Sequence, residues 1–319
     1  QQAPVRNELP LFASVFDGVF ETQQEPCVIS IEQLKAFWQR PMQHLAKSKG
    51  IRLQRDDLLL EENEPYGKLE GLDAYQLEQR IFDNALQSTP ATDAELTRQL
   101  QAEGLLAPGR LGLHTYHAHA ERLVPAMTTL QPLRIEPITW QLDLALSHAR
   151  VQGELLQYYA NGLIYNRGSK PMRAKDQLRS GFDALLARAC DFSLPCFNFT
   201  KNKLTQRSMP FTPHQAQQAL EVIVALYREG ETKIICFDAE ISFAFYQDKI
   251  KNPDLDVHAW LLDTQAKENE DYTPAFDQSI DFLTYGQGFI SEIAMKNPLQ
   301  FESLAMHIFR PIMGVARDD

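Results

Sequence analysis

Basic side chains gather in one stretch of the chain, between residues 165 and 207. Nine Lys and Arg residues lie there against three Asp residues, although the whole chain carries a formal net charge of −11. Lys and Arg bind phosphate oxygens through charge-assisted hydrogen bonds. A solvated helix face is the competing interpretation, because basic runs are common on exposed helices. The candidate phosphate-contacting residues are Arg167, Lys170, Arg173, Lys175 and Arg179.

Three carboxylates near this stretch could do different chemistry. Carboxylates that converge in space hold the Mg²⁺ ion that activates water in many hydrolytic sites. Asp143, Glu154 and Asp176 are the set that such a site would have to use here. A metal-dependent exonuclease with this rearranged set is therefore the alternative to a purely binding function.

Three histidines form a further candidate cluster in the segment HTYHAHAERL. His114 and His117 share one face of the expected helix, but His119 falls off that face, so the three cannot converge on one metal ion. We expect solvated or packed histidines and no metal. The chain also lacks the G-x-x-x-x-G-K-[ST] phosphate loop and the G-x-S-x-G elbow of many serine hydrolases, and we expect no cofactor.

Strands and one helix must position these residues. Apolar residues alternate with polar or small ones over 138–146, which predicts a half-buried strand. The segments 151–159 and 163–167 are two further strands, and Asn161-Gly162 between them predicts an antiparallel hairpin. A helix over about 174–189 follows, with its apolar residues on one face.

The remaining elements are mostly helical. Ser30, Thr92 and Thr212 each precede a capping box and predict helix starts. We predict a histidine-bearing helix over about 115–124 and a terminal amphipathic helix over 299–313. Short strands are expected at 9–16, 196–200 and 233–237. The fold class is therefore mixed α+β, an α/β protein with an N-terminal extension over 1–25, a helical part over 26–130 and a sheet-bearing core with C-terminal helices over 131–319.

Composition adds general expectations. No apolar run approaches the roughly 18 residues that span a membrane, and no signal peptide is recognisable, so we expect a soluble, cytoplasmic protein. Four scattered cysteines are expected to be reduced and buried. The first residue is Gln1 rather than Met, which we interpret as a fragment or a processed product. The acidic segment 56–64 is expected to be a solvated connector, with docking of a basic partner as its alternative.

Five segments, in order, resemble the C-terminal region of the RecC family, the gamma chains of exodeoxyribonuclease V. The matching segments span nearly everything from Pro26 to Val315. They read ISIEQLKAFWQRPMQHLAKSKGIRL, ENEPYGKLEGLDAYQLEQRIF, EGLLAPGRLG, VQGELL with GLIYNRGSKPMRAKDQL, and LQFESLAMHIFRPIM.

The resemblance implies a degenerate restriction-endonuclease-like core of the PD-(D/E)xK class, with helical additions. Active members of that class carry a metal-binding Asp on the second strand, where this chain has Leu156. On the third strand they carry Asp and, two residues later, Lys, where this chain has Tyr165 and Arg167. Glu154 is a poor substitute, because it does not stand at the position of the metal-binding Asp. We therefore expect no catalytic residue.

The resemblance also implies partners and a role. RecC-like chains hold RecB-like and RecD-like subunits, help to split duplex DNA and channel a single strand during recombination repair. A non-catalytic module that contacts DNA and docks these subunits is the leading hypothesis. The acidic end of the chain, with seven basic against sixteen acidic residues from Glu231 onward, is the expected RecD-docking surface. A pure protein-docking domain without DNA contact is a third hypothesis.

Overall fold

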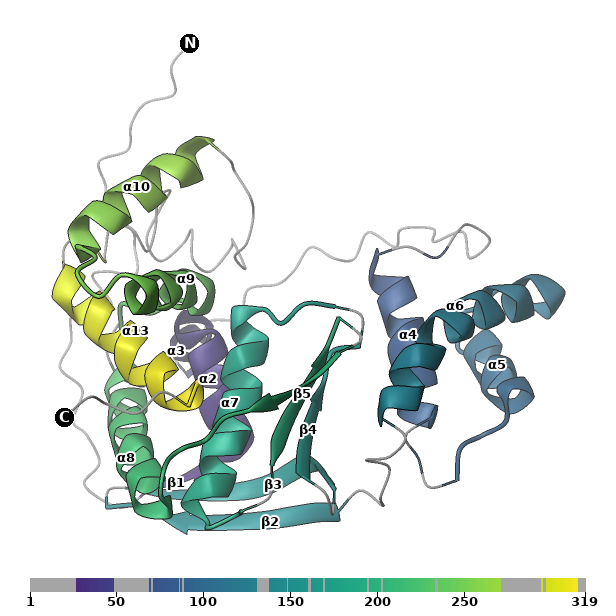
Figure 1. Cartoon of the computed structure of the whole chain (residues 1–319), viewed down its shortest axis with the longest axis horizontal. Coiled ribbons are helices and arrows are strands. Elements are labelled where there is room, and N and C mark those ends of the chain that lie inside the picture. The colour runs from purple at the N-terminus through teal and green to yellow at the C-terminus, as the bar shows by residue number, and fades with distance from the viewer. Residues whose placement is uncertain are drawn as a thin grey trace.

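The chain forms a mixed α/β structure in which helices pack against one sheet (Figure 1). The computed structural model describes residues 27–48, 69, 71–85, 87, 89–130, 138–147, 149–159, 162–168, 170–193, 195–201, 203–232, 235–270, 294 and 297–314. The predicted strand at 9–16 and the acidic segment 56–64 lie outside these residues. None of the described helices is long and apolar enough to cross a membrane.

The sheet has six strands and mixed pairing. They are β1 Cys27–Ser30, β2 Ile138–Ala145, β3 Ala149–Tyr159, β4 Gly162–Asn166, β5 Cys196–Thr200 and β6 Lys203–Arg207. Antiparallel pairing joins β2 to β3, β3 to β4 and β5 to β6, whereas β1 runs parallel to β3 and β4 parallel to β5. The predicted hairpin is confirmed, because Tyr159 pairs with Gly162 across the β3–β4 turn.

Several sequence predictions of elements need correction. The strands β1 and β6 were not predicted, and neither was the helix α10 Val257–Glu270. The predicted strand at 233–237 is wrong in its described part, since residues 235–237 have no strand structure. Their side chains are buried among the helices, which explains the apolar run without a strand. The histidine-bearing helix is longer than predicted, because it spans Gly109–Leu130 and accommodates Pro125.

Most predicted helices are confirmed, and their capping signals explain where they begin. Ser30, Thr92 and Thr212 each accept a hydrogen bond from the backbone N–H three residues on, within a complete capping box. The described helices, besides α10, are α2 Ile31–Gln39, α3 Pro41–Ser48, α4 Gly71–Ala85, α5 Asp93–Ala102, α6 Gly109–Leu130, α7 Ala174–Ala189, α8 Pro213–Gly230, α9 Ala239–Lys251 and α13 Pro298–Ile312.

The main core lies where α2 and α7 cover one face of the sheet. Val151 and Leu155 of β3 are fully buried in it, together with Leu34 of α2 and Phe182 of α7. A close approach of β3 to α2 occurs at Gly153, where an added Cβ would stand 3.3 Å from the side chain of Ile31. Apolar burial of this extent is the main stabilising contribution to such a fold.

One buried ion pair joins the two helices of this core. Lys35 of α2 is 4% exposed, and its Nζ lies 2.7 Å from a carboxylate oxygen of Asp183 on α7. Glu32 also contacts the Lys35 ammonium group, at 2.8 Å. Because a buried cation without an anion is costly, this pairing specifies how α2 lies against α7.

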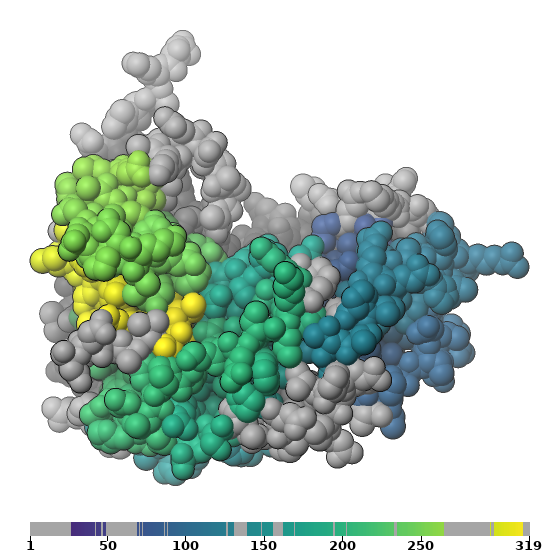
Figure 2. All heavy atoms as spheres, in the orientation of Figure 1, coloured from purple at the N-terminus to yellow at the C-terminus, as the bar shows by residue number. Residues whose placement is uncertain are grey.

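A second core forms among α4, α5 and α6. Leu77, Phe82, Leu100 and Tyr116 are buried in it, and it also includes Ile164 of β4 and Phe199 of β5. These helices (blue) stand beside the body of the molecule in Figure 2.

Two elements from the first part of the described chain pack against the sheet. β1 pairs with β3, and α2 lies in the main core. β1 was not predicted, because a four-residue parallel strand has no recognisable alternation of its own.

We predict that replacing Leu34 by Ala removes about 3 kcal/mol from the free energy of unfolding, through lost burial and a cavity. Leu34 is fully buried, whereas Leu299 is 76% exposed and makes the matched control. Leu299→Ala should change stability by less than about 0.5 kcal/mol. Urea denaturation followed by circular dichroism measures both. Equal, small losses would show that α2 is not part of the core.

Candidate functional site

The first candidate carboxylate, Glu154, lies on the exposed side of β3. Its neighbour Leu155 is fully buried, so the two side chains lie on opposite faces of the strand. The side-chain amide of Gln141 on β2 donates a hydrogen bond to Glu154 Oε1 at 2.5 Å. Leu156 lies in β3, but its side chain is outside the described part of the structure.

The second carboxylate, Asp143, is held by arginine on the same exposed side. Arg150 donates from Nε and Nη2 to the two carboxylate oxygens at 2.5 Å each, and Gln152 adds a bond at 3.2 Å. The hydrogen bonds from Arg150 lower the pKa of the Asp143 carboxyl. Asp143 is thus engaged in a surface ion pair.

The third carboxylate, Asp176, is the centre of a polar cluster between β4 and α7. The hydroxyl of Tyr165 donates to Asp176 Oδ1 at 3.0 Å, and the guanidinium Nε of Arg167 lies 3.0 Å from Oδ2. The backbone N–H of Arg173 donates to the same oxygen at 2.9 Å. Burial, and then the charge of Asp176, raise the pKa of the Tyr165 hydroxyl, which therefore remains a donor.

Arg167 extends this cluster to the helical unit. Its Nη1 donates to the hydroxyl of Tyr75 on α4 at 3.2 Å, and its guanidinium lies 5.6 Å from the centroid of the Tyr75 ring. The side chains of Arg167 and Asp176 are 16% and 13% exposed. The Arg167 guanidinium is therefore committed to contacts within the chain.

The N-terminus of α7 is also occupied by carboxylates. Asp176 accepts the N–H of Arg173, and Glu240 of α9 accepts the N–H of Ala174 at 3.3 Å. The backbone N–H groups at a helix N-terminus are the groups through which an anion usually binds there. The start of α7 is therefore already satisfied by the protein.

Three of the other four predicted cations are exposed. Lys170 and Arg173 are exposed, Lys175 is half-buried, and the side chain of Arg179 is 50% exposed with Glu32 at 3.5 Å. The N–H of Lys201 donates to the carbonyl of Lys170 at 3.2 Å, which brings the β5–β6 turn beside the loop before α7.

This turn adds two residues that the candidate set omitted. Lys201 and Lys203 are both exposed, and Lys201 has a φ of 49°, which is uncommon for a residue with a side chain. Both were among the nine basic residues counted between 165 and 207, but only the turn brings Lys201 beside Lys170. We call Lys170, Arg173, Lys201 and Lys203 the basic rim.

The three carboxylates are not brought together as a metal site. Glu154 and Asp143 lie on the exposed side of β2 and β3, whereas Asp176 contacts β4 from α7. Among the residues that the structure describes, no group of three His, Cys, Asp or Glu side chains could hold a metal ion.

The histidines and cysteines have structural environments. His119 is buried, and its Nδ1 lies 3.2 Å from Glu78, whereas His114 and His117 are exposed. All four cysteines are free, but only Cys196 and Cys236 are buried, while Cys27 and Cys190 are partly exposed. Burial raises the pKa of the Cys236 thiol to about 12.

Together these features define a mixed α/β protein whose polar cluster at the sheet is occupied by its own side chains and whose neighbouring cations face outward. The chain belongs to the RecC C-terminal domain family, whose model matches residues 26–249, more than half of the chain. This finding confirms the resemblance to RecC, the gamma subunit of exodeoxyribonuclease V. A search of curated proteins returned no match.

We predict that Asp176→Asn lowers the free energy of unfolding by about 3 kcal/mol, because it leaves the mostly buried Arg167 without its anion. Asp143→Asn is the matched control, since its ion pair with Arg150 is about half exposed. The control should lose much less stability. Urea titration compares the two, and equal losses would mean that the Asp176 cluster does not hold β4, α7 and α4 together.

Proposed function

We propose that this chain is a non-catalytic module of the exodeoxyribonuclease V (RecBCD) complex that contacts DNA and docks partner subunits during double-strand break repair in the cytoplasm. Membership of the RecC C-terminal domain family supports a role related to this complex. The observation that carries the proposal is the cluster at Asp176. Asp176 contacts Tyr165 and Arg167, the two degenerate nuclease positions of the third strand, while the adjacent basic rim is exposed.

The core is proposed to be a restriction-endonuclease-like fold that has lost its chemistry. The antiparallel β2–β3–β4 meander, the helix α7 after it and the parallel β4–β5 pairing support this proposal. Tyr165 and Arg167 stand where active relatives carry the metal-binding Asp and the Lys. Since Tyr165 donates to a carboxylate instead of supplying one, this position offers no carboxylate ligand to a divalent cation.

The basic rim is the proposed DNA contact. Lys170, Arg173, Lys201 and Lys203 come from two loops that are hydrogen-bonded to each other, so they can meet adjacent phosphates on one strand. Lys175 and Arg179 continue the charge along α7. Arg167 leaves the candidate set, because its guanidinium binds Asp176 and Tyr75. A rigid rim of this kind can guide a strand of a duplex that motor subunits are separating.

We predict that the triple variant Lys170→Ala, Arg173→Ala, Lys201→Ala weakens binding to a forked DNA duplex and lowers its salt dependence. The slope of log affinity against log salt is negative, and each lost phosphate contact should reduce its magnitude by about 0.9. Fluorescence anisotropy over a range of NaCl concentrations measures this. The control removes three exposed arginines of the α5–α6 region, Arg98, Arg110 and Arg122, and should leave the slope unchanged.

An unchanged slope in the first variant would leave the basic rim as a solvated face and support the pure docking alternative. The wild-type chain, incubated with labelled DNA and Mg²⁺ or Mn²⁺, is expected to leave the DNA intact. Robust cleavage that Glu154→Ala abolishes would replace the proposal by the exonuclease hypothesis that uses Glu154, Asp143 and Asp176.

Docking of the RecB-like and RecD-like subunits is proposed for other surfaces, with the acidic C-terminal region facing RecD. Asp254, Asp256 and Asp263 are exposed around the start of α10. Removing the chain from Asn297 onward cannot test this idea, because α13 is an integral part of the core. Phe301, Ile308 and Phe309 are fully buried against α7, α8 and α9.

We predict that the charge reversal Asp254→Lys with Asp263→Lys reduces capture of the RecD-like subunit severalfold. Charged residues at the edge of a protein interface control the rate at which the partners associate. Pull-down of co-expressed subunits at low salt measures this capture. Asp73→Lys with Glu121→Lys is the matched control on α4 and α6, where all substituted residues are again exposed acids. Equal capture by both variants would place the RecD contact elsewhere.

A further inference from the structure

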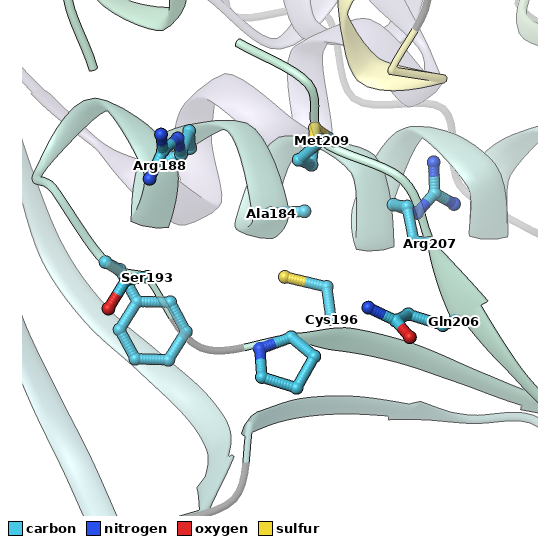
Figure 3. A pocket seen from close by; sticks show the side chains of 9 residues that line it. Ala184, Arg188, Ser193, Cys196, Gln206, Arg207 and Met209 are labelled. Carbon is cyan, nitrogen blue, oxygen red and sulfur yellow. The ribbon is translucent and has the colours of Figure 1, made fainter. Parts of the chain in front are cut away.

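A small cavity of about 140 Å³ lies between α7 and the β5–β6 hairpin. Arg188 and Ala184 of α7 line it, with Cys196 of β5 and Arg207 of β6. In Figure 3 the two arginines stand on opposite sides, and Cys196 lies between them. The cavity is separate from the Asp176 cluster.

Arg207 is a buried cation whose hydrogen-bond acceptors are all neutral. It is 8% exposed, so more than nine-tenths of its surface is buried. Its Nη1 donates to the carbonyl of Ile312 at 2.6 Å and lies 3.8 Å from the Met313 sulfur. Its Nη2 donates to Gln177 Oε1 and Ser180 Oγ, each at 2.7 Å. Its Nε is buried and has no hydrogen-bond partner.

Arg188 places a second cation at the same cavity. It is half-buried, and its Nε donates to the carbonyl of Phe211 at 2.5 Å. Within the described part of the chain, no carboxylate forms an ion pair with Arg188 or Arg207. The charge of Asp183 helps to raise the pKa of the Cys196 thiol, but this carboxylate is already paired with Lys35 Nζ at 2.7 Å.

The cavity is therefore positive at neutral pH. Burial lowers the pKa of the Arg207 guanidinium to about 10, so it still carries its proton at pH 7. Burial raises the pKa of the Cys196 thiol to about 11, so this sulfur is neutral and does not balance the charge. Buried cations are normally paired, and a buried donor without a partner normally has a ligand or a water molecule beside it.

We propose that this cavity is a binding site for a small oxyanion of the phosphate class, either inorganic phosphate or the phosphate group of a small monoester. Arginine is the side chain best suited to it, because its planar fork of donors matches the oxygens of phosphate. Arg207 supplies the unused Nε, and Arg188 supplies its remaining donors from the other side. Ser193 and Gln206 add polar side chains to a lining that also includes Phe192, Pro195 and Met209. The site does not depend on the proposed DNA contact.

The test uses inorganic phosphate and the whole chain. Thermal unfolding and isothermal titration calorimetry are measured with increasing phosphate, and NaCl keeps the ionic strength constant. A ligand that binds only the folded state raises the Tm with a saturable dependence on its concentration. Wild-type protein should show this rise, and Arg188→Gln should weaken phosphate binding at least tenfold. Arg122→Gln removes an exposed arginine on α6 and should bind phosphate as the wild type does.

A second measurement locates the site without a substitution. Phosphate should slow the alkylation of Cys196 by iodoacetamide, read by mass spectrometry, and should leave the partly exposed Cys27 unaffected. A glucose 6-phosphate titration then distinguishes a monoester from free phosphate. Either ligand supports the proposal. It is overturned if phosphate has no saturable effect beyond that of NaCl, if Arg188→Gln binds as tightly as wild type, or if Cys196 is not protected.

Discussion

The Asp176 carboxylate is the interaction on which the arrangement around the sheet depends. One oxygen accepts the Tyr165 hydroxyl, and the other contacts the Arg167 guanidinium and accepts the backbone N–H of Arg173, the residue just before α7. A single acid thereby joins β4 to the start of α7. Through Arg167 and Tyr75 the same cluster reaches α4, so it also joins the two hydrophobic cores.

Burial of charge is handled in different ways in neighbouring parts of the molecule. Arg167 is paired with Asp176 and Lys35 with Asp183, and both pairs connect α7 to another element. Arg207 is only 8% exposed, yet its hydrogen-bond acceptors are all neutral. A buried charge is stable only with compensating contacts. Asp176 and Asp183 supply these contacts to Arg167 and Lys35, whereas the Nε of Arg207 has no hydrogen-bond partner.

The local signals in the sequence predicted much of the fold. Capping boxes at Ser30, Thr92 and Thr212 marked helix starts, and Asn161-Gly162 marked the hairpin, because hydrogen bonds within a few residues decide these features. The parallel strand β1 and the short strand β6 escaped prediction, since their partners are distant or their alternation too brief. The buried segment at 235–237 was taken for a strand, because an apolar run does not reveal which kind of element buries it.

By itself the sequence determined that Tyr165 and Arg167 stand at the end of the third strand of the meander, and that positive charge gathers around them. Only the tertiary structure decided what those residues do. It placed Tyr75, 92 residues from Arg167 along the chain, against the same guanidinium, and it brought Lys201 beside Lys170. The reason is that residue type and local spacing specify which bonds a side chain can make, whereas its actual partner depends on which distant elements pack beside it.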